Sequence, residues 1–399
     1  MNAATVERQV AGVRRTVQFD AVLIIATAML ICLGIVFVAS ASAALAERAT
    51  GNPFHYAERQ VVYALIGLVA AAIAMSTPLS WWRRLGPALL LGALGLLTLV
   101  LVPGFGHEVN GSVRWLVIGP VRVIQASEPA RLLMLMFIAD YLARRETEVR
   151  ATFSGFTKPL ALVGVAVLLL LAEPDFGAAV VLLATVLGML FIAGARLRDF
   201  ALLLVAAVGA MAALALASPY RVQRLTGFLD PWADPYDSGF QLTQALIAIG
   251  RGEWSGVGLG AGVQKLFYLP EAHTDFVFAI IAEELGLVGV LLVIGLFSTV
   301  FLRCFRIGRG AAKTGQKYGS YLAYGIGLWI GMQALINLGV NMGVLPTKGL
   351  TLPLVSAGGS SLLVCCAALG LVLRAGYEAE REDGDVWQRK RFLAGERAA

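Results

Sequence analysis

Long apolar runs are the feature that most constrains this chain, because about 20 consecutive apolar residues are enough for a helix to cross a bilayer. Of the 399 residues, 58% are hydrophobic and only 15% are charged, whereas soluble domains carry about 25% charged residues. Within lipid the backbone must satisfy its own hydrogen bonds, which favours helices for these runs. The sequence therefore predicts an all-α fold, in a polytopic membrane protein.

The apolar runs predict ten transmembrane helices within a single transmembrane domain that covers residues 1–399. The predicted spans lie near 19–43, 58–77, 86–103, 128–142, 159–173, 177–194, 200–218, 276–302, 318–342 and 355–375. After the last span, residues 376–399 are rich in charge. We expect this segment to be a loosely ordered cytoplasmic tail.

The distribution of basic residues predicts how the chain is oriented. Ten spans place both termini on one side, and that side receives roughly two thirds of the 32 lysines and arginines. Such an excess is typical of the cytoplasmic face, so it does not indicate a nucleic-acid partner. The two longest connections, 104–127 and 219–275, then face outward. Their short apolar pieces predict interfacial or re-entrant helices.

Ionisable residues at membrane depth are costly and indicate function by default. In EAHTDFVFAIIAEELG, Asp275 stands at the start of the eighth predicted span, preceded by His273 and Thr274. Thr274 is the predicted N-cap of this helix. Asp275 is then either a helix-start charge stabilised by the helix dipole or a functional carboxylate at the outer membrane surface.

Three further clusters of charge lie in the outward segments. Glu128 and Arg131 have the i,i+3 spacing of an ion pair on one helix face. Asp175 follows a proline between two spans, where it would cap the next helix. Arg221 and Arg224 suit a phosphate or an anionic lipid headgroup, or they form a solvated charged face.

These segments together resemble the SEDS family of bacterial cell-wall polymerases, over nearly the whole chain. The most specific similarity covers residues 239–289, where VQKLFYLPEAHTDF is more typical of the cell-division branch of the family than of its elongation branch. Supporting similarities are EPDFG at 173–177, IQASE at 124–128, RLTGFLDPW at 224–232 and LPLVSAGGSS at 352–361.

The chain departs from the family pattern at three positions. Ala126 stands where proline is common, Ala357 where an aromatic residue is usual, and Arg131 where lysine is often found. The first bears on loop geometry, and the third keeps the charge. None of them falls within the most specific motif.

The resemblance implies a peptidoglycan glycosyltransferase that polymerises lipid II, a disaccharide-pentapeptide on undecaprenyl pyrophosphate, into β-1,4-linked glycan at the division septum. It assigns the catalytic role to Asp275, here interpreted as the general base, with undecaprenyl pyrophosphate as the leaving group. It also implies a divalent cation, Mg²⁺ or Mn²⁺, for which Asp275 is a possible ligand. We predict that substrate is bound by Arg221, Arg224, Lys348, Glu128, Arg131, Asp175, His273 and Thr274.

The implied partners and location follow the same resemblance. They are a class B penicillin-binding transpeptidase of the FtsI type and other division membrane proteins, such as the FtsQ, FtsL and FtsB complex. The expected location is the bacterial inner membrane at the septum, with a periplasmic active site.

Two other functions stay open at this stage. A lipid II flippase would use intramembrane charges, here Glu283 and Glu284, although the sequence lacks the inverted repeats typical of transporters. A non-enzymatic scaffold would use the outward loops to dock a transpeptidase. If the chain is a polymerase, Glu283 is expected to anchor the helix bundle from inside, about 12 Å deeper than Asp275 along the helix.

Overall fold

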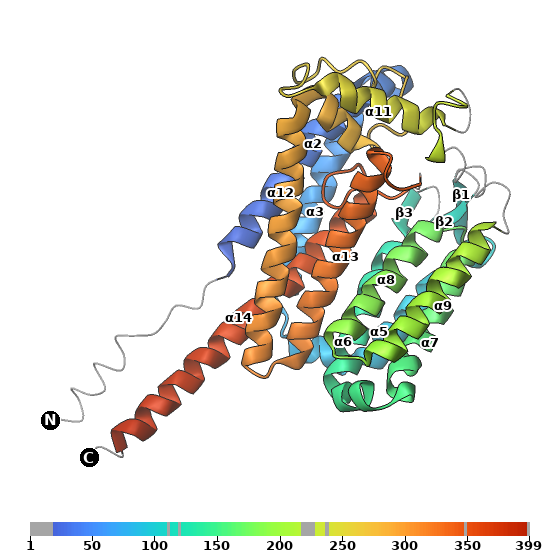
Figure 1. The fold of residues 1–399 in the computed structure, drawn as a ribbon. Coiled ribbons are helices and arrows are strands. Elements are labelled where there is room, and N and C mark those ends of the chain that lie inside the picture. The colour runs from blue at the N-terminus through green and yellow to red at the C-terminus, as the bar shows by residue number, and fades with distance from the viewer. Residues whose placement is uncertain are drawn as a thin grey trace.

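The computed structural model describes residues 19–109, 112–118, 121–216, 228–235, 239–346 and 349–396, which form a bundle of helices with a small sheet at one end (Figure 1). The helices are α2 (Ala21–Thr50), α3 (His55–Ser76), α4 (Leu79–Arg84), α5 (Gly86–Leu101), α6 (Ser127–Ala151), α7 (Phe153–Ala172), α8 (Phe176–Ile192), α9 (Leu197–Leu216), α11 (Phe240–Gly252), α12 (Val277–Lys313), α13 (Lys317–Asn341) and α14 (Gly359–Glu396). The strands are β1 (Gly106–Val109), β2 (Ser112–Ile118) and β3 (Val121–Gln125).

Each of the ten predicted ranges contains a helix, so the prediction of a mainly helical architecture is confirmed. Within the described residues, six helices are long and apolar enough to cross a membrane: α2, α3, α7, α12, α13 and the part of α14 that ends at Glu382. Helices α5 and α8 are apolar but shorter. The count of ten membrane crossings therefore stays a prediction.

Helix α13 joins the two sides of the bundle. It packs against α12 and α14 on one side and against α6 and α8 on the other. Helices α2 and α3 pack with α12 and α14 respectively, whereas α5, α6 and α7 pack with one another (Figure 1). Side chains on the outer faces are apolar and exposed, for example Val69 at 60% and Leu91 at 70%. Such exposure is expected where lipid, not water, surrounds the protein.

The first long connection contradicts the prediction of short helices. It forms a three-stranded antiparallel sheet in the order β1-β2-β3. Leu116 of β2 packs with Val100 and Ala126 in a small separate core. At Gly106 an added Cβ would lie 1.9 Å from the carbonyl oxygen of Val100, so the strand approaches α5 at a distance that requires glycine. In the second long connection, the helix α11 agrees with the prediction.

The single span predicted at 276–302 is interrupted. Helix α12 breaks at Gly286, which has φ 63° and ψ −156°. The carbonyl oxygens of Glu283 and Glu284, freed by the break, accept hydrogen bonds of 3.0 and 3.1 Å from Val257 N and Gly258 N. The segment after α11 thus satisfies the backbone groups that a broken membrane helix leaves open.

Helix α14 continues to Glu396, through most of the segment predicted as a charged tail, and extends beyond the rest of the bundle (Figure 1). That the tail is loosely ordered and cytoplasmic stays a prediction.

Candidate active site

Asp275 lies in the turn before α12 and is partly buried. Its backbone carbonyl accepts hydrogen bonds from Asn337 Nδ2 at 2.9 Å and Asn341 Nδ2 at 3.1 Å. Asn341 Oδ1 also accepts a hydrogen bond of 3.2 Å from Ala279 N, in the first turn of the helix. Two amide side chains of α13 therefore fix the backbone of Asp275 and leave its carboxylate to other contacts.

The predicted capping role of Thr274 is wrong. Helix α12 begins at Val277, and its N-cap residue makes no side-chain capping bond. Asn341 supplies an acceptor in its place, which satisfies one of the helix-start N–H groups. The Thr274 hydroxyl donates a hydrogen bond of 2.6 Å to Glu271 Oε2 and closes the preceding turn.

His273 connects the same turn to two other segments. Its carbonyl oxygen accepts a hydrogen bond of 2.9 Å from Ala357 N, and its ring lies 5.0 Å from the ring of Tyr56. Burial lowers the pKa of His273, while Glu271 acts in the opposite direction. The imidazole is thus kept neutral near pH 7, and its observed role is to hold the loop in place.

The segment before α14 runs directly past the Asp275 carboxylate. A Cβ added to Gly349 would lie 3.1 Å from Asp275 Oδ2. The next carbonyl, that of Leu350, accepts a hydrogen bond of 2.6 Å from Asn337 Nδ2. Asn337 therefore ties this segment and the Asp275 turn to the same position on α13.

Arg131 and Glu128 form the predicted i,i+3 pair, with 3.6 Å between Arg131 Nη1 and Glu128 Oε2, and both are buried. Arg131 Nη1 also donates a hydrogen bond of 2.6 Å to Gln333 Oε1. Gln333 Nε2 in turn donates to the carbonyl of Thr351 at 3.0 Å. The pair is thus linked through α13 to the segment that lies against Asp275.

Asp175 caps α8 as predicted. Its Oδ1 accepts a hydrogen bond of 3.1 Å from Ala178 N, and its Oδ2 accepts one of 3.2 Å from Ser127 Oγ. Close by, a Cβ on Gly177 would lie 2.9 Å from the side chain of Leu350. The turn between α7 and α8 therefore packs against the same segment as Asn337.

Glu173 is a buried carboxyl that the sequence interpretation did not select. Its side chain is fully buried, and neither carboxyl oxygen has a hydrogen-bond partner among the described residues. Burial raises the pKa of Glu173 to about 8, Asp175 raises it further, and Arg114 opposes the rise. Its place beside Asp175 in EPDFG is the signal that could have identified it.

The raised pKa of Glu173 makes stability depend on pH. Because the folded-state pKa lies above the ordinary value of 4.5, its contribution is fully present below about pH 4.5 and is lost as the pH rises towards 8. We expect Glu173→Gln to raise the free energy of unfolding at pH 8 by about 1–3 kcal/mol, and to change it little at pH 5. Thermal unfolding in detergent at the two pH values measures this, and an equal effect at both would contradict the assignment.

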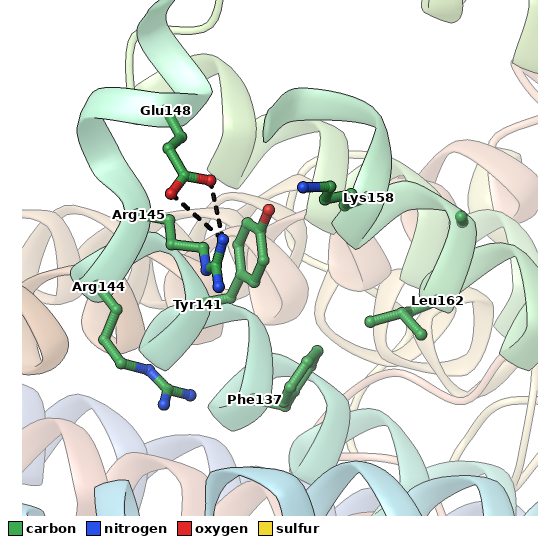
Figure 2. Close-up of a pocket in the computed structure, with 8 residues that line it drawn as sticks. Phe137, Tyr141, Arg144, Arg145, Glu148, Lys158 and Leu162 are labelled. Carbon is green, nitrogen blue, oxygen red and sulfur yellow. Dashed lines mark hydrogen bonds and ion pairs between the residues drawn. The ribbon is translucent and has the colours of Figure 1, made fainter. Parts of the chain in front are cut away.

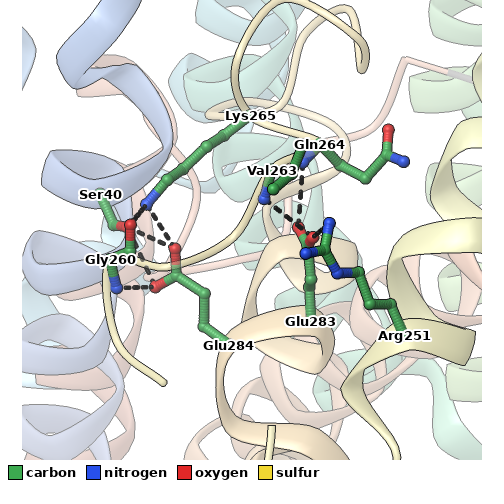
Figure 3. A network of polar contacts seen from close by, with 8 residues as sticks. All are labelled: Ser40, Arg251, Gly260, Val263, Gln264, Lys265, Glu283 and Glu284. Carbon is green, nitrogen blue, oxygen red and sulfur yellow. Dashed lines mark hydrogen bonds and ion pairs between the residues drawn. The ribbon is translucent and has the colours of Figure 1, made fainter. Parts of the chain in front are cut away.

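Glu284 is engaged in a polar network at the α11 end of the bundle (Figure 3). Its Oε1 lies 2.6 Å from Lys265 Nζ and accepts a hydrogen bond of 2.7 Å from Ser40 Oγ. Its Oε2 accepts a hydrogen bond of 2.9 Å from Gly260 N. This buried charge is paired and hydrogen-bonded, as burial requires.

Glu283 is engaged with the same loop (Figure 3). Its oxygens accept hydrogen bonds from Val263 N at 2.9 Å and Gln264 N at 3.3 Å, and Arg251 Nη1 lies 3.7 Å away. Glu283 therefore anchors the loop that precedes α12. This corrects the expectation that it anchors the helix bundle from inside. Neither glutamate is a free charge of the kind that a transport path would use.

Three predicted substrate ligands, Arg221, Arg224 and Lys348, lie outside the described residues. The described residues contain no group of three or more His, Cys, Asp or Glu side chains that could hold a metal ion.

The fold and the site define a class: a multi-pass membrane protein in which the turn before α12, helix α13 and the segment before α14 meet at Asp275. The family model of FtsW, RodA and SpoVE, described as "Cell cycle protein", matches residues 20–381. The chain belongs to this family, which is the SEDS family.

Curated relatives match most of the chain. A "Probable peptidoglycan glycosyltransferase FtsW" of Nitrosococcus halophilus is 58% identical and covers 91% of this chain and 93% of its own length. One of the same name from Coxiella burnetii is 52% identical and covers 91% and 97% respectively.

Solved structures agree with the fold. A chain from "Structural coordination of polymerization and crosslinking by a peptidoglycan synthase complex" has a TM-score of 0.73 and 31% identity, covering 90% of this chain and 98% of that one. The rod shape determining protein RodA of Thermus thermophilus has a TM-score of 0.67 and 30% identity, covering 90% and 97%.

Proposed function

We propose that Asp275 is the general base of a peptidoglycan glycosyltransferase that polymerises lipid II at the division septum. The protein is a peptidoglycan glycosyltransferase. The names of its curated relatives give the same activity for those relatives. The observation that carries the role of Asp275 is its placement. Its backbone is fixed by two amides of α13, and its carboxylate lies beside Gly349 where the segments meet.

The chemistry requires one base. Undecaprenyl pyrophosphate is a good leaving group once its charge is neutralised, so no acid is needed to protonate it, unlike in glycoside hydrolysis. Asp275 takes the proton from the acceptor 4-hydroxyl as that oxygen attacks the donor anomeric carbon. Attack on the face opposite the leaving group converts an α-linked donor into a β-1,4 linkage.

The site supplies orientation as well as a base. Because Asn337 and Asn341 bind the backbone carbonyl of Asp275, they restrict its position without neutralising its carboxylate. Glycine at position 349 avoids a Cβ that would lie 3.1 Å from Asp275 Oδ2. Both features favour a close approach of the acceptor hydroxyl, which general-base catalysis needs.

The negative charge of the pyrophosphate is neutralised by the cationic residues predicted to bind it, which are Arg221, Arg224 and Lys348. A divalent cation, when bound, would supply further neutralisation. Magnesium is commonly held by one or two carboxylates together with substrate phosphates. In such an arrangement Asp275 would be the carboxylate that this chain contributes.

The membrane setting follows from the substrate. A lipid-linked sugar keeps its tail in the bilayer while its headgroup lies at the surface. Asp275, which is bound by Asn337 and Asn341 near the C-terminal end of α13, is then on the periplasmic side, and both termini are cytoplasmic. Among partners, a class B penicillin-binding transpeptidase is supported by the synthase complex that contains a similar chain. The FtsQ, FtsL and FtsB complex is a further proposed partner.

Reconstitution tests this function directly. The protein is purified with its transpeptidase partner and supplied with fluorescent lipid II and Mg²⁺ or Mn²⁺. We expect glycan ladders on a gel. Lipid II scrambling in liposomes without ladders would indicate a flippase instead, and a complex that forms but does neither would indicate a scaffold.

A further inference from the structure

At the end of the bundle opposite α11 (Figure 1), α6 and α7 border an open pocket of about 770 Å³ (Figure 2). Its walls combine aromatic and apolar side chains, such as Phe137 and Leu162, with basic ones, Arg145 and Lys158. The pocket has no role in the proposed glycosyl transfer. Four of its eight lining residues are charged and four are aromatic or aliphatic, so it combines apolar walls with charges that could bind a ligand.

The rim of the pocket carries an excess of positive charge. Arg145 lies over the ring of Tyr141, 5.9 Å from its centroid, and pairs with Glu148 at 2.9 Å. Lys158 is exposed and forms no hydrogen bond or ion pair with any residue that the structure describes. Arg144, also on the rim, is bound to Asp140. Arg145, which is paired with Glu148, and Lys158, which has no such partner among the described residues, therefore stand on either side of Tyr141 (Figure 2).

An apolar stripe continues from this rim along α7. Lys158, Ala161, Val165 and Leu168 follow the i, i+3, i+7, i+10 spacing of one helix face. Val165 is 46% exposed and Leu168 is 67% exposed. A charged end followed by an exposed apolar stripe on a membrane helix matches an amphiphile with an anionic head.

The pocket is held open by local structure. The helical path of α6 is interrupted at Arg145, with φ −122° and ψ 26°. The Tyr141 hydroxyl donates a hydrogen bond of 3.1 Å to the carbonyl of Gly155, at the start of α7. A Cβ on Gly155 would lie 2.5 Å from the carbonyl oxygen of Glu148, so this close approach of the two helices requires glycine.

We propose that this pocket binds the phosphate of an anionic phospholipid, with Arg145 and Lys158 on the headgroup and an acyl chain along α7. Basic pockets between membrane helices on the cytoplasmic side suit such headgroups. The inference depends on the orientation given with the proposed function, which places this end in the inner leaflet. A free phosphate would use the same cations but not the apolar stripe.

Lipid binding can be measured on the full-length protein without lipid II. Native mass spectrometry in detergent counts the phosphatidylglycerol molecules retained over a titration, against phosphatidylcholine as the neutral comparison. We expect Arg145→Gln with Lys158→Gln to weaken phosphatidylglycerol binding by about 25-fold, or about fivefold for each lost charge. The matched control is Arg306→Gln with Arg309→Gln, which removes two exposed arginines from α12 outside the pocket and should change affinity less than twofold.

Two further arms decide between this proposal and its rivals. Glu148→Gln removes the rim anion and should tighten lipid binding; a loss would show that the Arg145–Glu148 pair serves only the fold. Excess inorganic phosphate should leave the bound lipid in place, and displacement would identify a phosphate site instead. Equal weakening in the pocket and control variants would overturn the proposal. Because no arm involves glycan synthesis, a failure of the proposed function would not alter these results.

Discussion

Asp275→Asn is expected to reduce the rate of glycan polymerisation by about 10²–10⁴-fold, the range in which general-base catalysis contributes. Asparagine keeps the shape of the side chain but cannot accept the proton. The fold should be unaffected, because Asn337 and Asn341 bind the backbone carbonyl and not the carboxylate. The measurement is the initial rate of ladder formation from fluorescent lipid II, with the variant purified in its transpeptidase complex.

A neighbouring acid provides the matched control for Asp275. Glu271 lies in the same turn, is exposed, and accepts its hydrogen bond from Thr274. Glu271→Gln keeps an acceptor there, so we expect activity within about twofold of wild type because surface substitutions have small effects. If excess Mn²⁺ restores the polymerase activity of Asp275→Asn, Asp275 is a metal ligand instead of the base. If the variant is fully active without this addition, Asp275 has no catalytic role.

The membrane helices could be predicted because the bilayer fixes how many apolar residues a span needs. Two local side-chain interactions could be predicted for a similar reason, since they depend on near neighbours in the chain. Glu128 pairs with Arg131 one turn along the helix, and Asp175 caps the helix that it precedes. The choice of Asp275 as the catalytic residue came instead from the family resemblance. Its contacts with α13 and with the segment before α14 were not predicted, because spacing within one segment carries no information about the others.

The sheet in the first long connection could have been predicted from the sequence. SVRWLVI and VRVIQ are rich in β-branched residues and are separated by Gly and Pro, a pattern typical of a hairpin. Membrane context led to helices being preferred for any apolar piece. The interruption at Gly286 is different, because apolar periodicity continues through it. The backbone groups on either side of the break bond to residues 253–258, which are distant in the sequence.

The sequence also contained a signal for the amide side chains of α13 that bind the Asp275 turn and the segment beside it. Gln333, Asn337 and Asn341 follow the i, i+4, i+8 spacing of one helix face within an apolar span. Polar residues in such a span face the protein interior or a cavity. The spacing thus predicts a polar stripe on α13, but which loop it binds depends on tertiary structure.

The other large effect is expected at Arg131, where Arg131→Leu should destabilise the protein by about 3–5 kcal/mol. Arg131 and Glu128 are 2% and 4% exposed, so removing the guanidinium leaves a buried carboxylate without its partner. Gln333 also loses the hydrogen bond that it accepts from Arg131, while still holding the carbonyl of Thr351. Thermal unfolding in detergent, followed by tryptophan fluorescence, measures the loss.

A second substitution separates the free-energy cost of an unpaired buried charge from the cost of lost packing. Glu128→Gln removes the unpaired charge, so the double variant with Arg131→Leu should recover most of the stability lost in the single variant, because replacing both members of a buried pair is often nearly neutral. Arg131→Lys, which keeps the charge, should remain within about 1.5 kcal/mol of wild type, the size of one hydrogen bond. If the double variant is as unstable as Arg131→Leu alone, the cost lies in the contacts of Arg131 with Gln333 and Trp329, and the ion pair contributes little. If it recovers, the pair is what keeps α6 stable where it meets α13, and the segment beside Asp275 depends on it through Gln333.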